Sequence, residues 1–216
     1  MVSTKKNLIQ ITYNMICDIG FTNITIRKIS KEANCSIAAL YRHFENFDHM
    51  LTYACIGFLE PYVEDYKLIK AYTNDPVKIS IEMWLHLSRT SFFKPEIFAQ
   101  LFLGPYKNSI YNIIKDYYII FDRDIFNVGE VSALMEDMGD IFFRNYDYIK
   151  NSLPNKSKKE IQILSDLTVF NYCGILGSLL KNTYTVSEVE KMSDRFVDGL
   201  HYLYKDELSN DENNIY

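Results

Sequence analysis

The chain is short of residues that break helices: its 216 residues include only 8 glycines and 5 prolines. No stretch alternates apolar and polar residues over the length of a strand, and no segment repeats. Several stretches instead place apolar residues at the 3.6-residue spacing of amphipathic helices. These observations predict an all-α fold.

Signatures of common enzyme classes are also missing. The sequence contains no GxSxG, no phosphate-binding P-loop and no GxGxxG. Two Glu/His pairs stand four residues apart, Glu45 with His49 and Glu82 with His86. Neither pair has an evident third ligand, so ordinary pairing on a helix surface is favoured over a metal site. We therefore expect no enzyme activity, no metal and no cofactor.

Signals for export and for membrane insertion are lacking as well. The N-terminal residues MVSTKKNLIQITYNM begin with positive charge but have no apolar core of a signal peptide, and no run of 18 apolar residues follows. The cysteines have no CxxC spacing, which is typical of reduced thiols; they are Cys17, Cys35, Cys55 and Cys173. We expect a cytoplasmic protein without a membrane partner.

Basic residues are fewer than acidic ones: 23 Lys and Arg stand against 28 Asp and Glu, so the net charge is −5. Residues 1–50 nevertheless carry six basic and four acidic side chains, a local charge of +2, which leaves −7 for the rest. A global sum can hide such an asymmetry. The basic end of the chain is where contact with a polyanion is to be sought.

Capping residues divide the chain into helices. Thr25, Ser36, Asn46 and Asp75 each precede an apolar periodic stretch, and Ser157 and Thr185 each open a capping box with a Glu three residues later. The predicted helices are 4–19, 26–33, 37–43, a long one from 47 to 72 with a kink at Pro61, then 76–87, a helix opened by Pro95, 106–121, 131–148, 158–182 and 186–203.

The two short helices 26–33 and 37–43, joined by a tight turn at residues 33–35, predict a helix-turn-helix. In such a unit the second helix enters the DNA major groove and the first crosses the backbone. The small residues let the second helix approach the bases closely, while its polar side chains reach bases and phosphates. The predicted DNA-binding residues are Thr25, Arg27, Lys28, Ser36, Ala38, Ala39, Tyr41, Arg42 and His43.

Residues 20–51, GFTNITIRKISKEANCSIAALYRHFENFDHML, resemble the DNA-binding domain of the TetR family of transcriptional regulators. The resemblance rests on the Gly-aromatic start, the core pair of Ile29 and Ala33, and the series Ser-x-x-x-Leu-Tyr-x-His-Phe ending at Phe44. Two positions depart from the family pattern. Asn34 stands where Gly is usual, and Phe47 stands where a Lys commonly contacts phosphate, which removes one expected DNA anchor.

The resemblance implies a regulator, most often a repressor, that binds a near-palindromic operator as a homodimer and is released by a small effector. It also implies a helix-turn-helix domain, 1–48, a helical domain for effector binding and dimerisation, 49–208, and here a polar tail, 209–216. The aromatic content of the second domain suggests an apolar or aromatic ligand. The predicted pocket residues are Trp84, His86, Phe102, Tyr106 and Tyr117.

Two apolar helices, 157–182 and 187–205, independently favour pairing of two copies through a four-helix bundle. The predicted interface residues are Leu167, Phe170, Gly174, Gly177, Met192, Phe196 and Leu200. Three alternatives stay open. The chain could be a ligand-binding or protein-interaction module without DNA function, an all-helical enzyme, or a regulator in which Cys17 or Cys35 senses oxidation.

Overall fold

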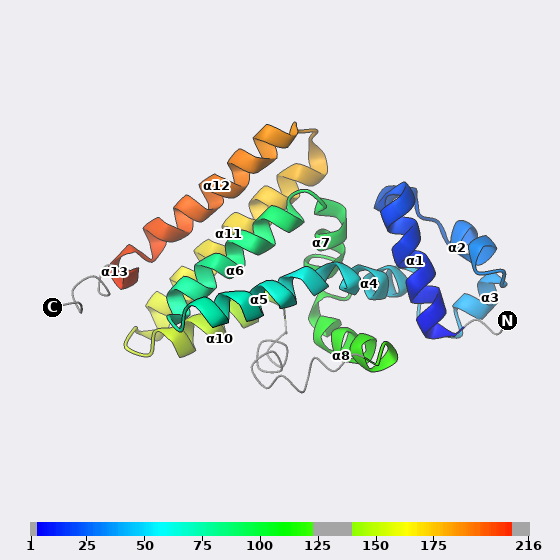
Figure 1. Cartoon of the computed structure of the whole chain (residues 1–216), viewed down its shortest axis with the longest axis horizontal. Helices are drawn as coiled ribbons and strands as arrows, with labels where there is room; N and C mark the ends of the chain where they lie inside the picture. The colour runs from blue at the N-terminus through cyan, green and yellow to red at the C-terminus, as the bar shows by residue number, and fades with distance from the viewer. Residues whose placement is uncertain (1–3, 123–139, 209–216) are drawn as a thin grey trace. The chain divides into compact units, whose positions relative to one another are not determined.

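The computed structural model describes residues 4–122 and 140–208, and all of the regular elements in these ranges are helices (Figure 1). This confirms the predicted all-α fold. Part of the predicted helix 131–148 and the tail 209–216 lie outside the described residues. The chain divides into two compact units: Met1–Glu60 with Glu96–Asp140, and Pro61–Pro95 with Ile141–Tyr216.

The first unit contains the N-terminal helices. They are α1 (Lys5–Ile19), the 3-10 turn η1 (Phe21–Asn23), α2 (Ile26–Glu32), α3 (Ile37–Leu40) and α4 (Phe47–Ile56). Each predicted cap is present: the side chains of Thr25, Ser36 and Asn46 accept hydrogen bonds from the backbone N–H groups of Lys28, Ala39 and His49. Helix starts were therefore predictable, because a cap is a local interaction.

The same unit includes a later segment that the predicted boundary at residue 48 assigned to the second domain. It holds α7 (Pro95–Phe102), which begins at the unit boundary, the turn η3 (Lys107–Ser109) and α8 (Ile110–Ile120). Helix α8 packs on α4. The predicted start at Tyr106 is instead the 3-10 turn, and the α-helix begins at Ile110.

The predicted long helix from residue 47 is interrupted. A 3-10 turn, η2 (Gly57–Leu59), separates α4 from α5 (Glu60–Tyr72), the segment through which the chain passes from the first unit to the second. The break precedes Pro61, whose ring would clash with the carbonyl four residues earlier, that of Gly57. The predicted kink therefore lies on the N-terminal side of the proline.

The second unit is a helical bundle of α6 (Pro76–Ser91), α10 (Ile141–Ser152), α11 (Lys158–Lys181), α12 (Val186–Leu203) and α13 (Lys205–Leu208) together with most of α5. Helix α6 packs on α12, and α11 packs on both α10 and α12 (Figure 1). Both predicted capping boxes are present at Ser157 and Thr185. The core between these helices is aromatic: rings of Trp84, Phe92, Tyr172 and Phe196 contact one another.

Candidate functional site

Helices α2 and α3 form the predicted helix-turn-helix. The turn between them is closed by hydrogen bonds from Asn34 N to Lys31 O (3.1 Å) and from Cys35 N to Ser30 O (3.0 Å). Asn34 adopts a φ of 46°, the left-handed conformation that Asn tolerates better than most residues. Its place at this turn instead of the usual Gly therefore keeps the turn intact.

Three buried side chains hold the unit against its neighbours: Ile29 on α2, Leu40 on α3 and Phe44 just beyond it. Fixing these anchors leaves the opposite face of both helices to solvent. Most of the predicted DNA-contacting residues are exposed there, namely Thr25, Arg27, Lys28, Ser36, Ala38, Tyr41 and Arg42, with His43 half-buried. The exposed set combines three positively charged groups with hydroxyl groups, which suits phosphates and base edges.

Two predictions about the reading helix are wrong. Ala39 is only 6% exposed, because it packs inward beside Leu40, so it cannot approach a base. The α-helix also ends at Leu40 and not at His43. A turn closed by His43 N to Leu40 O (3.0 Å) follows, so Tyr41 and Arg42 project from the end of a helix of one turn.

A polar cluster joins α1, α4 and α8. Lys5 Nζ lies 2.5 Å from Asp116 Oδ2, and the Tyr53 hydroxyl donates to the same oxygen at 2.6 Å. Burial tends to raise the pKa of Asp116, but the hydrogen bonds from Lys5 and Tyr53 and the charge of Lys5 outweigh it and hold the pKa below its usual value. Burial, with the hydrogen bond to Asp116, raises the pKa of Tyr53.

The helix-turn-helix together with its exposed end, residues 25–44, is called the reading turn below. A second cluster lies directly after it, at the start of α4. The ring of Tyr106 stacks on His49 at 4.7 Å between centroids. Its hydroxyl donates to Glu45 Oε2 (2.9 Å) and accepts from Asn46 Nδ2 (2.7 Å). Burial lowers the pKa of His49, whose Nδ1 accepts from Glu45 N at 3.1 Å. The sequence predicted Tyr106 in a ligand pocket, and in the structure its side chain contacts those of Glu45, Asn46 and His49.

The other predicted pocket residues are divided between the two units. Phe102 and Tyr117 are buried in the first unit, and the Tyr117 hydroxyl donates to Glu60 at 3.2 Å. Trp84 is buried in the second unit, where its indole N–H donates to Asn145 Oδ1 at 3.1 Å. These three side chains pack in the cores of their units, and their role in binding a ligand stays a prediction.

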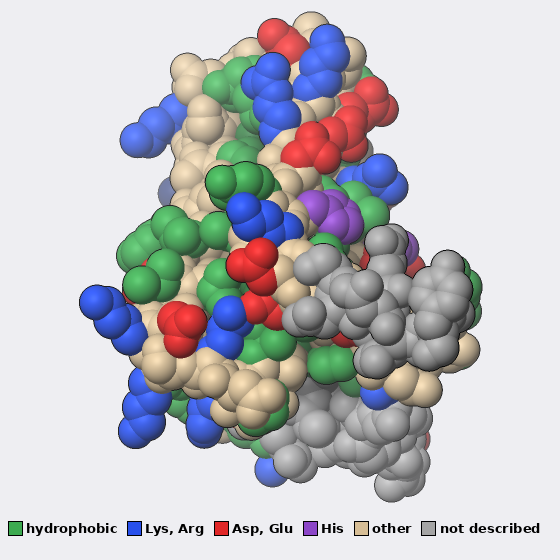
Figure 2. Space-filling model, turned by 90° about the vertical axis from the view of Figure 1, so that its left-hand side faces the viewer, with side chains coloured by type: hydrophobic (Ala, Val, Ile, Leu, Met, Phe, Trp, Pro, Cys, Tyr) green, Lys and Arg blue, Asp and Glu red, His purple; other side chains and the backbone are tan. Residues whose placement is uncertain are grey.

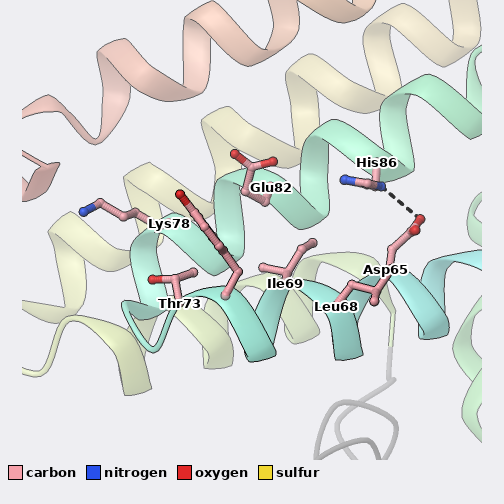
Figure 3. A pocket seen from close by; sticks show the side chains of 8 residues that line it. Asp65, Leu68, Ile69, Thr73, Lys78, Glu82 and His86 are labelled. Atoms are coloured by element: carbon pink, nitrogen blue, oxygen red, sulfur yellow. Dashed lines mark ion pairs between the residues drawn. The ribbon is translucent and has the colours of Figure 1, made fainter.

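A groove in the second unit does include His86 (Figure 3). It runs between α5 and α6 and has a volume of about 820 Å³. Its lining residues are Asp65, Leu68, Ile69, Tyr72, Thr73, Lys78, Glu82 and His86. His86 Nδ1 lies 3.0 Å from Asp65 Oδ2. The sequence offered a signal in the Glu82–His86 spacing, but Asp65 and the α5 side of the groove were missed.

The predicted dimer residues separate into two groups. Leu167 and Phe170 are exposed on α11, a Cβ added at Gly174 or Gly177 would meet no atom within 4 Å, and Met192 on α12 is half-buried. Phe196 and Leu200, in contrast, are 0% and 1% exposed because they pack inside their own protomer. They cannot contact a second copy, which corrects the prediction for these two positions.

The surface charge of the molecule is mixed. On the face shown in Figure 2, Lys and Arg side chains are interspersed with Asp and Glu and with hydrophobic side chains. Helix α11 has the length and composition of a membrane span, and 33% of that apolar stretch is buried where the helix packs on α10 and α12. In residues 4–122 and 140–208 no three His, Cys, Asp or Glu side chains are grouped to hold a metal.

Comparisons with known proteins agree with this architecture, although no family model matches the chain. An HTH-type transcriptional regulator of Staphylococcus aureus is 24% identical over 151 residues, covering 66% of this chain and 81% of the relative. The structure of RolR with resorcinol has a TM-score of 0.54 at 12% identity, covering 90% of this chain and 85% of that one. Thermus thermophilus FadR, a TetR-family repressor in complex with lauroyl-CoA, has a TM-score of 0.53 at 11% identity, covering 91% and 93%.

The exposed reading turn and the helical bundle define an all-helical helix-turn-helix protein. More particularly, the chain has the fold of the TetR-family regulators, so the resemblance seen in residues 20–51 is confirmed in the fold. The proteins that share it include transcriptional regulators, and two of those structures hold small ligands.

Proposed function

We propose that this protein is a one-component transcriptional repressor that binds a near-palindromic operator as a homodimer. The observation that carries the proposal is the reading turn, which presents Tyr41 and Arg42 to solvent on a backbone anchored by Ile29, Leu40 and Phe44. A charged side chain held at the end of such a helix can contact phosphate or a base edge. The regulatory names of similar proteins support the same function.

Selection of bound sequences from a random duplex pool, at low and moderate salt, tests the DNA function. We expect a near-palindromic site that the Arg42→Ala variant fails to enrich. Arg195→Ala is the matched control, because Arg195 is an exposed arginine on α12. If neither salt concentration yields an enriched sequence, the chain is a ligand-binding or interaction module and not a DNA-binding regulator.

The proposed dimer forms through the outward face of α11. Leu167, Phe170, Gly174 and Gly177 recur at helical spacing, and the two glycines leave room for a second helix to come close. Phe170→Glu should shift the protein toward monomer in sedimentation. Ile119→Glu places the same charge at an exposed apolar position in the first unit and should leave the association state unaltered. Equal sedimentation of both variants as dimers contradicts this interface.

The proposal also includes release of the protein from DNA by a small effector. A small ligand bound in the second unit acts through the α4–η2–α5 segment, the first place where the chain passes between units, and changes the separation of the two reading turns. A coupling of about 1–3 kcal/mol is typical of such systems. Spin labels on the two α2 helices of a dimer measure the separation. An effector that releases DNA without altering this distance contradicts the mechanism.

A further inference from the structure

The groove between α5 and α6 has a well-defined local geometry. Its two walls are consecutive helices of the second unit, joined by a short connection at residues 73–75. Thr73 N donates to Ile69 O (2.9 Å), Asp75 N donates to Thr73 Oγ1 (3.1 Å), and Asp75 then caps α6. The walls are therefore tied together at one end by the chain itself. A volume of about 820 Å³ is ample for a drug-sized molecule.

The charges along the groove are unequally compensated. Figure 3 shows Lys78 toward one end, the ion pair of Asp65 with His86 at the other, and Glu82 between them on α6. Lys78 Nζ lies 3.7 Å from Asp75 Oδ2, so its charge is shared with a carboxylate outside the lining. Glu82 is an exposed residue that lines the groove, and among the described residues no hydrogen bond or ion pair of its carboxylate is present.

The α5 wall supplies apolar surface beside that carboxylate. Leu68 and Tyr72 are large side chains that are 70% and 91% exposed, and Ile69 lies between them in the lining. These three positions share one face of α5 through their helical spacing. An apolar body can rest on this wall while a charged group reaches across to α6, and a tyrosine ring adds favourable contact with a cation.

From this juxtaposition we infer that the groove binds small organic cations, molecules with an apolar or aromatic body and one ammonium group. Glu82 pairs with the ammonium, and Leu68 and Tyr72 contact the apolar body. Anions of the same shape are disfavoured because Glu82 repels them and because Lys78, the lysine of the lining, already has a carboxylate beside it in Asp75. If the protein is the proposed repressor, such a cation is its effector. Binding of the cation does not depend on the repressor function; only its effect on DNA binding does.

Direct binding tests the inference without DNA. Three probes share one ring system and differ in charge: 1-naphthylmethylamine, 1-naphthalenemethanol and 1-naphthoate, titrated into the full chain at neutral pH by fluorescence or calorimetry. We expect the amine to bind most tightly and the carboxylate least. Added salt should weaken only the amine, because a partly exposed charge pair is screened.

Variants locate the site. Glu82→Gln should weaken the amine by about fivefold, the size expected for a solvent-accessible charge pair, and should leave the neutral alcohol unaffected. Glu190→Gln removes an equal charge from an exposed position on α12 outside the groove and should change neither probe. Leu68→Ser should weaken amine and alcohol alike, because both lose the apolar wall.

The outcomes separate this inference from the repressor function. Tighter binding of the carboxylate, or equal losses in Glu82→Gln and Glu190→Gln, overturns the inference even if the protein selects an operator. Binding of the amine that depends on Glu82 supports it even if no operator is found. With an operator in hand, the amine should lower DNA affinity in the parent protein and do so less in Glu82→Gln.

Discussion

The reading turn and the helical bundle are stabilised in different ways. The reading turn has little buried surface of its own; it relies on caps at Thr25 and Ser36 and on three apolar anchors. The bundle of the second unit relies on interlocking aromatic rings around Trp84 and Tyr172. The first region can exchange surface side chains freely, whereas the second responds to any change of volume.

The largest effect is expected from breaking the bundle. Trp84→Ala removes a buried ring that contacts Tyr172 and Phe196, and it leaves Asn145 Oδ1 without the indole donor. Loss of a buried aromatic side chain costs about 3–5 kcal/mol of the free energy of unfolding. Denaturant titration should show this loss. Phe143→Ala truncates an exposed ring on α10 and should stay near the parent; equal losses would mean that the ring cluster is not the core.

Next in size is a change that affects function and leaves stability alone. Arg42→Ala should weaken operator binding by about tenfold and reduce its salt dependence, since it removes one positive contact. Its melting temperature should match that of the parent, because Arg42 is exposed. A lowered melting temperature would show that Arg42 helps to hold the turn, and the contrast between the two regions would then be weaker than described.

A cap in the bundle gives an intermediate effect. Asp75 accepts hydrogen bonds from Val77 N (2.8 Å) and Lys78 N (3.3 Å) at the start of α6. Asp75→Ala should lower the free energy of unfolding by about 1 kcal/mol, and Asp75→Asn should restore most of it because an amide oxygen still caps. Chemical denaturation of the three proteins makes the comparison. Equal stability of Ala and Asn variants would show that α6 needs no cap.

The smallest predicted effect depends on pH. The folded-state pKa of Asp116 lies below its unfolded value, so the ionised carboxylate stabilises the protein above pH of about 3.9 and this stabilisation is lost as pH falls through the lower folded pKa. Asp116→Asn should therefore cost about 0.5 kcal/mol at neutral pH, since water screens a part-exposed pair.

The difference between the parent and Asp116→Asn should shrink in denaturation curves recorded below pH 4. Asp18→Asn, an exposed carboxylate on the same α1 that supplies Lys5, is the control. A difference that persists unchanged in acid contradicts the ionic origin of the contribution.

Local signals in the sequence located most helix starts and the reading turn. Caps at Thr25, Asn46 and Ser157 are interactions over three residues, and the pattern of residues 20–51 is contiguous, so both can be read directly. The grouping of residues 96–140 with the N-terminal helices was not predicted. It depends on contacts such as Lys5 with Asp116, which are 111 residues apart.

The candidate site was predicted less completely for the same reason. Whether Ala39 faces a base or the core depends on where the neighbouring helices lie. In the one-turn helix α3, neighbouring residues face opposite ways: Ala38 is exposed and Ala39 is buried. Trp84 and Tyr106 are residue types that line pockets, but only tertiary contacts show that Trp84 is buried in the second unit and that Tyr106 contacts Glu45 and His49. Asp65 could not be paired with His86 without knowing that α5 and α6 lie together.

Gly57, at the interruption between α4 and α5, has a consequence for how this sequence can change over time. A Cβ at this position would lie 2.8 Å from the ring of Tyr13 on α1, closer than real contacts allow. Any replacement therefore inserts a wedge between α1 and the segment that leads out of the first unit. A replacement at position 57 therefore requires the Tyr13 ring to move or to become smaller, which couples the choice of residue at these two positions.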